Sequence, residues 1–233
     1  GKSLFMCHCA SAYLAQGLNV LYITLEMAEE RIAERIDANL LDTTIDDLHA
    51  LPKDLYDSKI LKVKNKTNGQ LIIKEYPTAS AHSGHFRALF NELALKKSFR
   101  PDVVFVDYLN ICASARFKGG NISSYFYIKA IAEELRGLAV EFNVPIFSAT
   151  QTTRTGFVST DIGLEDTSES FGLPATADFM FALMSNEELE QLGQMKVKQL
   201  KNRYNDPAIN RSFIVGVDRA KMKLYDVENT AQN

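Results

Sequence analysis

Short runs of apolar residues alternate along this chain with longer segments in which apolar residues recur every three or four positions. An almost continuous apolar run is typical of a strand that is buried on both faces of a sheet. Apolar residues at every third or fourth position are typical of a helix with one buried face. We therefore predict strands and helices largely in alternation. The strands are residues 19–25, 70–76, 103–107, 145–151 and 177–184, and the helices are residues 3–16, 28–40, 85–97, 125–142 and 187–191.

This alternation indicates an α/β fold, with a mostly parallel sheet flanked by helices. Three further strands are predicted at residues 195–200, 212–218 and 221–227. Because only short turns separate them, we expect them to be antiparallel additions at the C-terminal edge of the sheet. Residues 42–69 are polar and mixed, and they predict a surface insertion with one short helix.

Two long polar loops, residues 113–124 and 152–174, each follow a predicted strand. Open α/β sheets bind ligands at the carboxyl ends of their strands, so these loops are candidate functional segments. The length of 233 residues suits one large domain with a substantial core. We expect this domain to span residues 1–227 and the tail at residues 228–233 to be disordered.

Composition and charge exclude several classes of protein. Hydrophobic residues make up 46% and charged residues 24% of the chain, which excludes a long coiled coil, a collagen-like fibre and a long disordered tail. No apolar run approaches the ~20 residues of a membrane span, and no signal-peptide pattern is present. The net charge of −3 does not indicate a dedicated nucleic-acid coat protein. Residues 194–223, however, hold eight basic and two acidic residues, and such a local basic face can bind phosphates.

The cysteines are few and odd in number, which is typical of reduced thiols in a cytoplasm-like compartment. They are Cys7, Cys9 and Cys112. His8 lies between the first two, but on a helix their side chains point ~200° apart and do not share one metal ion. His82 and His85 can share a helix face, yet two ligands do not make a metal site, so we expect a polar helix start there.

The chain opens with Gly1-Lys2-Ser3, directly before a predicted helix. This is the second half of the phosphate-binding motif G-x-x-x-x-G-K-[ST], in which backbone N–H groups at a helix N-terminus bind phosphates. The lysine of that motif reaches the β- and γ-phosphates, and the hydroxyl coordinates Mg²⁺. The tripeptide alone is common. Because a domain seldom begins at this point, we expect the chain to be an N-terminally cropped fragment.

Three polar residues at strand ends supply the other groups that such a site needs. Asp107 ends the clearest buried strand and is placed to hold the water shell of Mg²⁺. Glu26 follows the first strand and is placed to activate a water molecule, and Gln151 ends a later strand as a polar sensor. Each has a plainer explanation, such as a solvated aspartate or a glutamate that stabilises a helix N-terminus. Their joint order with Lys2 is much harder to explain by chance.

These residues and several longer stretches resemble the motor domain of DnaB-type replicative DNA helicases, a RecA-like fold, and look closest to the phage helicases that act with a primase. The resemblance covers most of the chain, and the ordered combination of L-E-M, V-D-Y-L and K-x-R is specific. The matching stretches are Gly1-Lys2-Ser3, Leu25-Glu26-Met27 with Arg35, Val106-Asp107-Tyr108-Leu109, Ala149-Thr150-Gln151, Glu169-Ser170 with Ala177-Asp178, and Lys201-Asn202-Arg203.

The resemblance implies roles for the matching residues at the nucleotide. Glu26 would be the general base for water, and Gln151 would sense the γ-phosphate and relay it towards the DNA-contacting loops. Ser3 and Asp107 would be the residues at Mg²⁺, with Asp107 as the Walker B carboxylate. The implied nucleotide-binding residues are Gly1, Lys2, Ser3 and Asp107.

The resemblance also implies residues that act on other molecules. Lys201 and Arg203 would reach the nucleotide held by the neighbouring subunit, and an arginine finger of this kind contributes ~10³–10⁵ in rate. The plainer explanation for this pair is a solvated edge strand, because lysines protect strand edges. DNA would be contacted by loops after the Walker B and sensor strands. The implied DNA-contacting residues are Arg116, Lys118, Arg154, Glu169 and Ser170.

Residues and resemblance together predict the motor domain of a hexameric replicative helicase, driven by ATP or GTP with Mg²⁺, that moves along single-stranded DNA. The expected partners are further copies of the chain, a primase and a helicase loader, with no membrane. The expected location is the cytoplasm, that of the host cell if the protein comes from a phage. Two alternatives stay open: a RecA-like recombinase with the same core, and an oligomerisation module without activity.

Overall fold

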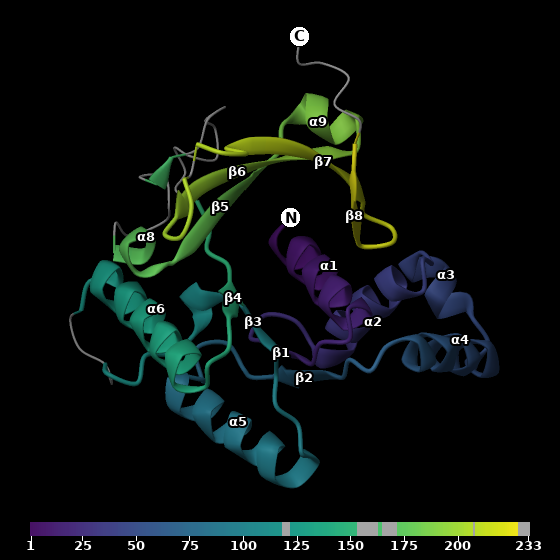
Figure 1. Cartoon of the computed structure of the whole chain (residues 1–233), viewed down its shortest axis with the longest axis horizontal. Helices are drawn as coiled ribbons and strands as arrows, with labels where there is room; N and C mark the ends of the chain where they lie inside the picture. Colours follow the sequence, from purple (N-terminus) through teal and green to yellow (C-terminus); the bar gives the residue numbers. More distant parts are fainter. Residues whose placement is uncertain (118–121, 153–162, 165–171, 207, 228–233) are drawn as a thin grey trace.

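Four parallel strands in the order β2-β1-β3-β4 form the centre of the molecule (Figure 1). They are β1 (Val20–Thr24), β2 (Leu71–Glu75), β3 (Val103–Asp107) and β4 (Ile146–Ser148). All residues of β1 and β3 are buried, as their continuous apolar runs predict. This computed structural model describes residues 1–117, 122–152, 163–164, 172–206 and 208–227.

The strand register brings the carboxyl ends of the central strands together. Thr24, the last residue of β1, lies opposite Asp107, the last residue of β3. The backbone N–H of Leu25 donates to the carbonyl of Asp107 at 2.9 Å, so the pairing continues one residue past β1. Residues that follow these two strands therefore begin at the same edge of the sheet.

Helices cover both faces of the parallel sheet. They are α1 (Lys2–Ala15), α2 (Glu29–Leu40), α5 (Ser83–Lys97) and α6 (Ser124–Glu141). Because side chains alternate along a strand, Tyr22 of β1 packs with α1 and α2, whereas its neighbour Ile23 packs with α5 and α6. The helices and strands predicted here are confirmed within two residues at each end, except that β4 ends at Ser148 rather than at Gln151.

Residues 42–69 contain two helices, where the sequence predicts one short helix. They are α3 (Ile45–Ala50) and α4 (Lys53–Lys66). The hydroxyl of Thr44 accepts the N–H of Asp47 and caps α3, and Pro52 stands directly before α4. No residue of α4 is buried, so no apolar periodicity marks this helix in the sequence.

The predicted C-terminal strands are present and form an antiparallel sheet of their own, in the order β5-β6-β7-β8. They are β5 (Phe179–Met184), β6 (Gln194–Asn202), β7 (Ser212–Asp218) and β8 (Lys223–Asp226), with the short helices α8 (Gly172–Thr176) and α9 (Glu187–Gln191) beside them. Within the described part of the chain, no strand of this sheet pairs with β4 at the edge of the parallel sheet. The second sheet instead packs against α1 and α2: the rings of Phe5 and Phe181 are 5.0 Å apart, and Asn39 donates to the carbonyl of Met222 at 2.6 Å.

The histidine and cysteine motifs have structural surroundings. His82 accepts the N–H of Gly84 at 3.0 Å and His85 accepts the N–H of His82 at 3.2 Å, which confirms the polar start of α5. Cys7 is fully buried and lies 3.9 Å from the hydroxyl of Tyr22. Among the described residues, no helix is both long and apolar enough to cross a membrane.

Candidate functional site

The N-terminus of α1 is built to face an anion. Lys2 is the first residue of the helix, Gly1 is its N-cap, and Ser3 follows in the same turn. In the described structure no side chain caps this end, and its first turn has no acidic residue. Unpaired N–H groups and the helix dipole therefore leave this end with partial positive charge, which favours phosphate.

Asp107 presents a buried carboxylate at the end of β3. It is only 1% exposed, and its Oδ2 accepts the hydroxyl of Tyr22 at 2.8 Å. Its Oδ1 is buried and has no hydrogen-bond partner among the described residues. A buried carboxylate oxygen without a partner is costly, so this atom is suited to an additional ligand.

The strand register brings Glu26 to the same edge of the sheet as Asp107. Leu25 bonds to the backbone of Asp107, and Glu26 is the next residue, with its side chain exposed to solvent. The hydroxyl of Thr24 shapes this turn, since it accepts the N–H of Met27 at 3.1 Å and donates to the carbonyl of the same residue at 2.8 Å. The turn directs the chain from β1 into α2 and places Glu26 at the carboxyl edge of the sheet.

Tyr108 connects the four predicted residues in space. The ammonium of Lys2 lies 5.0 Å from the centre of the Tyr108 ring, and the amide of Gln151 donates to the Tyr108 hydroxyl at 3.3 Å. Burial raises the pKa of Tyr108, and the negative charges of Glu26 and Asp107 raise it further. We refer to these five residues as the Tyr108 cluster. The sequence alone assigns no role to Tyr108, because an aromatic residue after a buried strand has no pattern of its own.

The oxygen atoms at this edge suit Mg²⁺. Hard cations of this kind take oxygen ligands and usually keep several waters. The unpaired Oδ1 of Asp107 is one such oxygen, and the hydroxyl of Thr150, beside Gln151, is also buried without a partner among the described residues. Ser3, in the first turn of α1, supplies a further hydroxyl. The residues present therefore fit the cation that the P-loop motif implies.

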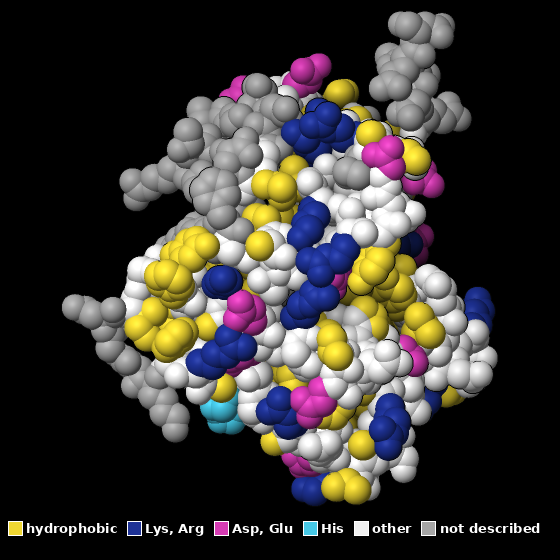
Figure 2. Space-filling view, turned by 60° about the vertical axis from the view of Figure 1, so that its left-hand side comes forward, with side chains coloured by type: hydrophobic (Ala, Val, Ile, Leu, Met, Phe, Trp, Pro, Cys, Tyr) yellow, Lys and Arg dark blue, Asp and Glu magenta, His cyan; other side chains and the backbone are white. Residues whose placement is uncertain are grey.

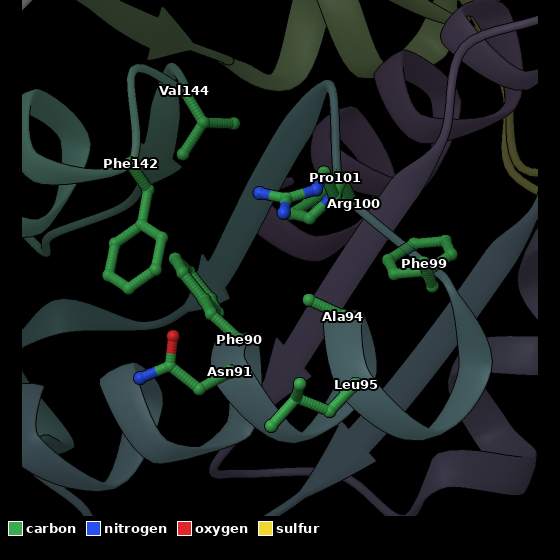
Figure 3. Close-up of a pocket in the computed structure, with 9 residues that line it drawn as sticks. All are labelled: Phe90, Asn91, Ala94, Leu95, Phe99, Arg100, Pro101, Phe142 and Val144. Atoms are coloured by element: carbon green, nitrogen blue, oxygen red, sulfur yellow. The ribbon is translucent and has the colours of Figure 1, made fainter.

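A pocket of about 270 Å³ lies elsewhere, at the amino ends of the strands (Figure 3). Pro101 and Val144, which precede β3 and β4, form part of its wall. Three phenylalanines belong to its apolar lining, and they are Phe90, Phe99 and Phe142. No member of the Tyr108 cluster lines it, so this pocket is not the candidate nucleotide site.

Lys201 and Arg203 lie away from the Tyr108 cluster, at the end of β6. The ammonium of Lys201 donates to the carbonyl of Pro174 at 2.6 Å. Arg203 donates to the carbonyl of Ala175 at 3.2 Å and pairs with the carboxylate of Asp178 at 3.2 Å. Among the contacts of the described residues, none joins this pair to the cluster. This placement is compatible with a role at a neighbouring subunit.

One of the five predicted DNA-contacting residues is described. Arg116 pairs with the carboxylate of Glu133 and lines a surface pocket of about 560 Å³ together with Phe126 and Lys129. Four of the predicted contacts lie outside the described residues, and they are Lys118, Arg154, Glu169 and Ser170.

The basic C-terminal region is partly neutralised. Lys221 and Lys223 both pair with Asp42, at 3.2 and 2.8 Å, and these hydrogen bonds lower the pKa of that carboxyl. Figure 2 shows basic side chains in a band through the middle of one face, with acidic side chains beside several of them. This face therefore does not form a broad, uniformly positive surface.

The parallel sheet and the helices on both of its faces define a RecA-like α/β domain. One solved structure, described as an ATPase domain, is similar, with a TM-score of 0.79 and 18% sequence identity over 97% of this chain and 80% of that chain. A solved DnaB-like replicative helicase, described with its interactions with primase, has a TM-score of 0.77 and 18% identity over 97% of this chain and 54% of that chain.

The chain belongs to the DnaB-like helicase C-terminal domain family, whose model matches residues 1–214. It is 46% identical over 231 residues to a DnaB-like replicative helicase of Enterobacteria phage T4, covering 98% of this chain and 49% of that protein. A probable plasmid replicative DNA helicase of Chlamydia psittaci is 30% identical over 158 residues, covering 66% of this chain and 33% of that protein. The chain thus spans half or less of the length of these relatives.

Proposed function

We propose that this domain is the nucleoside-triphosphate-hydrolysing motor of a replicative DNA helicase that moves along single-stranded DNA. The observation that supports this most strongly is the Tyr108 cluster. Its residues come from the starts or ends of four separate elements and meet at the carboxyl edge of one parallel sheet, where such sheets bind ligands. Family membership supports the same activity.

In this proposal each residue has one task at the nucleotide. The N-terminus of α1 and Lys2 bind the β- and γ-phosphates of ATP or another nucleoside triphosphate. Ser3 and Asp107 hold Mg²⁺, which neutralises charge on the phosphates when it is bound. Glu26 accepts the proton of the attacking water, and Gln151 hydrogen-bonds the γ-phosphate. On hydrolysis Gln151 loses this partner, while its bond to Tyr108 connects it to the segment that leads into residues 113–117.

Lys201 and Arg203 complete the site of a neighbouring subunit in a ring. Neither residue has a task in the first half of the proposal, and the side chain of Arg203 is about two-fifths exposed. Such a cation stabilises the charge that develops on the transferring phosphoryl group. If Arg203 acts on the neighbouring subunit, nucleotide is hydrolysed at the interfaces between the subunits of a homo-hexamer. The further partners in this proposal are a primase and a helicase loader, and the location is the cytoplasm.

Single-strand-stimulated hydrolysis and nucleotide-dependent rings, measured together on the full-length protein, test the proposed function. We expect single-stranded DNA to raise the rate of hydrolysis and nucleotide to convert the protein into closed rings. The Lys2→Ala variant, purified in parallel, controls for contaminating hydrolases. Open filaments on DNA would favour a recombinase instead, and a protein that neither binds nor hydrolyses nucleotide would favour an oligomerisation module.

A further inference from the structure

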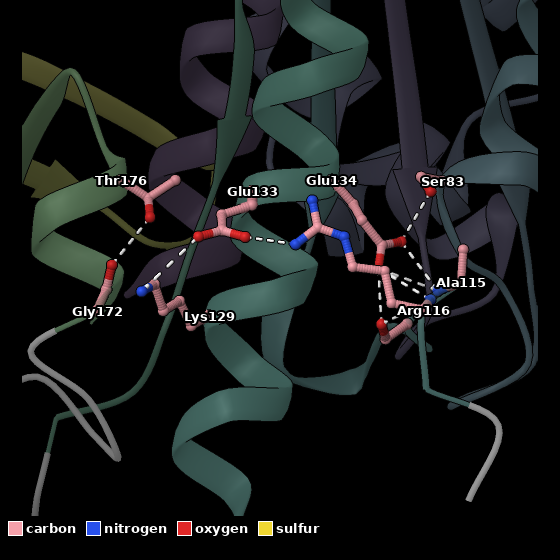
Figure 4. A network of polar contacts seen from close by, with 9 residues as sticks. Ser83, Ala115, Arg116, Lys129, Glu133, Glu134, Gly172 and Thr176 are labelled. Atoms are coloured by element: carbon pink, nitrogen blue, oxygen red, sulfur yellow. Dashed lines mark hydrogen bonds and ion pairs between the residues drawn. The ribbon is translucent and has the colours of Figure 1, made fainter.

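The segment that follows the Walker B strand is held to α6 by one carboxylate. Glu134 of α6 accepts the hydroxyl of Ser114 at 2.6 Å and the backbone N–H of Ala115 at 2.9 and 3.1 Å, on its two oxygens (Figure 4). The hydroxyl of Ser83, the first residue of α5, donates to the same carboxylate at 2.8 Å. The backbone N–H of Arg116 adds a longer bond of 3.4 Å.

Every backbone N–H from residue 113 to residue 116 has a partner, and we refer to residues 113–116 as the loop base. Ala113 donates to the carbonyl of Ala81 at 2.8 Å, and Ser114 donates to the hydroxyl of Tyr127 at 3.1 Å. Ala115 donates to Glu134, and Arg116 donates to the hydroxyl of Ser114 at 3.2 Å as well as to Glu134 at 3.4 Å. The loop base is therefore held by Tyr127 and Glu134 of α6 and by the carbonyl of Ala81.

The charge of Glu134 is maintained by these contacts. Burial acts to raise the pKa of this carboxyl, but the hydrogen bonds from Ser114, Ala115, Ser83 and Arg116 outweigh it and hold the pKa below its ordinary value. An ionised carboxylate accepts hydrogen bonds more strongly than a neutral one. Glu133, its neighbour on α6, has a different role, since it pairs with the side chain of Arg116 and not with the loop backbone (Figure 4).

The loop base connects the nucleotide edge to the predicted DNA contacts of this loop. Only five residues separate Tyr108 from Ser114, and the η1 turn (Leu109–Ile111) occupies three of them. Of the predicted DNA-contacting residues of this loop, Arg116 ends the loop base and Lys118 follows it in sequence. A loop contacts its ligand accurately only when its start is fixed to a rigid element, and here that element is α6.

We infer that Glu134 is a positioning residue, which fixes the loop base to α6 and so sets where Arg116 meets single-stranded DNA. This inference rests on the proposed function for the DNA contact, whereas the attachment of the loop base stands on the hydrogen bonds alone. Glu134 does not belong to the Tyr108 cluster, so hydrolysis in the absence of DNA does not depend on it.

The test compares Glu134→Gln with Glu133→Gln in the full-length protein, because both changes remove one charge from adjacent positions of α6. A glutamine at position 134 keeps one neutral acceptor oxygen and replaces the other oxygen with an NH2 donor, so it cannot reproduce the charged, two-oxygen acceptance of the Ala115 N–H and the Ser114 hydroxyl. We expect amide hydrogen exchange of residue 115 to accelerate about tenfold or more in Glu134→Gln only. We also expect the DNA concentration for half-maximal stimulation of hydrolysis to rise about tenfold, with the DNA-free rate unchanged.

The outcomes separate the two levels of the proposal. Equal exchange and equal DNA response in the two variants would overturn the positioning role, as would faster exchange with an unaltered DNA response. Wild-type hydrolysis that ignores DNA would contradict the proposed function, and the DNA part of this inference with it, while the exchange data would still decide whether Glu134 holds the loop base. Glu134→Ala, which removes every bond at once, is expected to exceed Glu134→Gln in both measurements.

Discussion

Replacing Arg203 with alanine is expected to lower nucleoside-triphosphate turnover by ~10³–10⁵-fold, the contribution of an arginine finger. The variant should still bind nucleotide normally, because Arg203 contacts Asp178 and Ala175 and not the Tyr108 cluster of its own chain. Arg211→Ala removes an exposed arginine from the same sheet region and serves as the control, with activity close to that of the wild type. Nucleotide affinity and turnover are measured on the full-length variants.

Mixing the Arg203→Ala and Lys2→Ala variants separates action in trans from action in cis. Each variant alone is inactive in the proposal, but a mixed ring contains interfaces with an intact Lys2 on one subunit and an intact Arg203 on the next. We expect such mixtures to regain part of the turnover. Mixtures that stay inactive although mixed rings form, or an Arg203→Ala variant that is fully active, would show that Arg203 is not a finger.

Replacing Glu26 with glutamine is expected to lower turnover by ~10²–10⁴-fold, the usual contribution of a general base, while nucleotide binding is retained. The change keeps the shape of the side chain and removes only its ability to accept a proton. Single-turnover hydrolysis, measured beside nucleotide binding, distinguishes a defect in chemistry from a defect in affinity.

The plainer explanation of Glu26 makes a different prediction. If its charge served only the N-terminus of α2, Glu26→Gln would cost ~0.3–1 kcal/mol of stability and leave turnover intact. Glu30→Gln is the matched control, because Glu30 lies in the first turn of that helix and outside the Tyr108 cluster. A turnover loss in Glu26→Gln alone supports the base; equal turnover in both variants contradicts it.

The parallel sheet and the polar residues at its edge are predictable because burial leaves a strong pattern. Continuous apolar runs identify β1 and β3, and parallel pairing then requires Glu26 and Asp107 to begin at one edge. The exposed helix α4 left no such pattern, because an apolar stripe forms only where a helix packs against something.

Pairing partners were harder to predict than strands. The sequence of β5 to β8 shows where strands occur. The alternation of apolar and polar residues within a strand, however, does not indicate which other strand it pairs with. Phe5 on α1 and Phe181 on β5 are distant in sequence, and their contact belongs to the packing that places the second sheet on α1. The role of Tyr108 likewise depends on contacts from Lys2 and Gln151, which sequence spacing alone does not reveal.

The structure of the full-length protein with Mg²⁺ and a non-hydrolysable nucleoside triphosphate tests the central claim most directly. We expect the β- and γ-phosphates at the start of α1 beside Lys2, Mg²⁺ in the reach of Ser3 and Asp107, and the γ-phosphate facing Glu26 and Gln151. A triphosphate bound away from the start of α1 would contradict the account. So would a triphosphate whose γ-phosphate faces neither Glu26 nor Gln151.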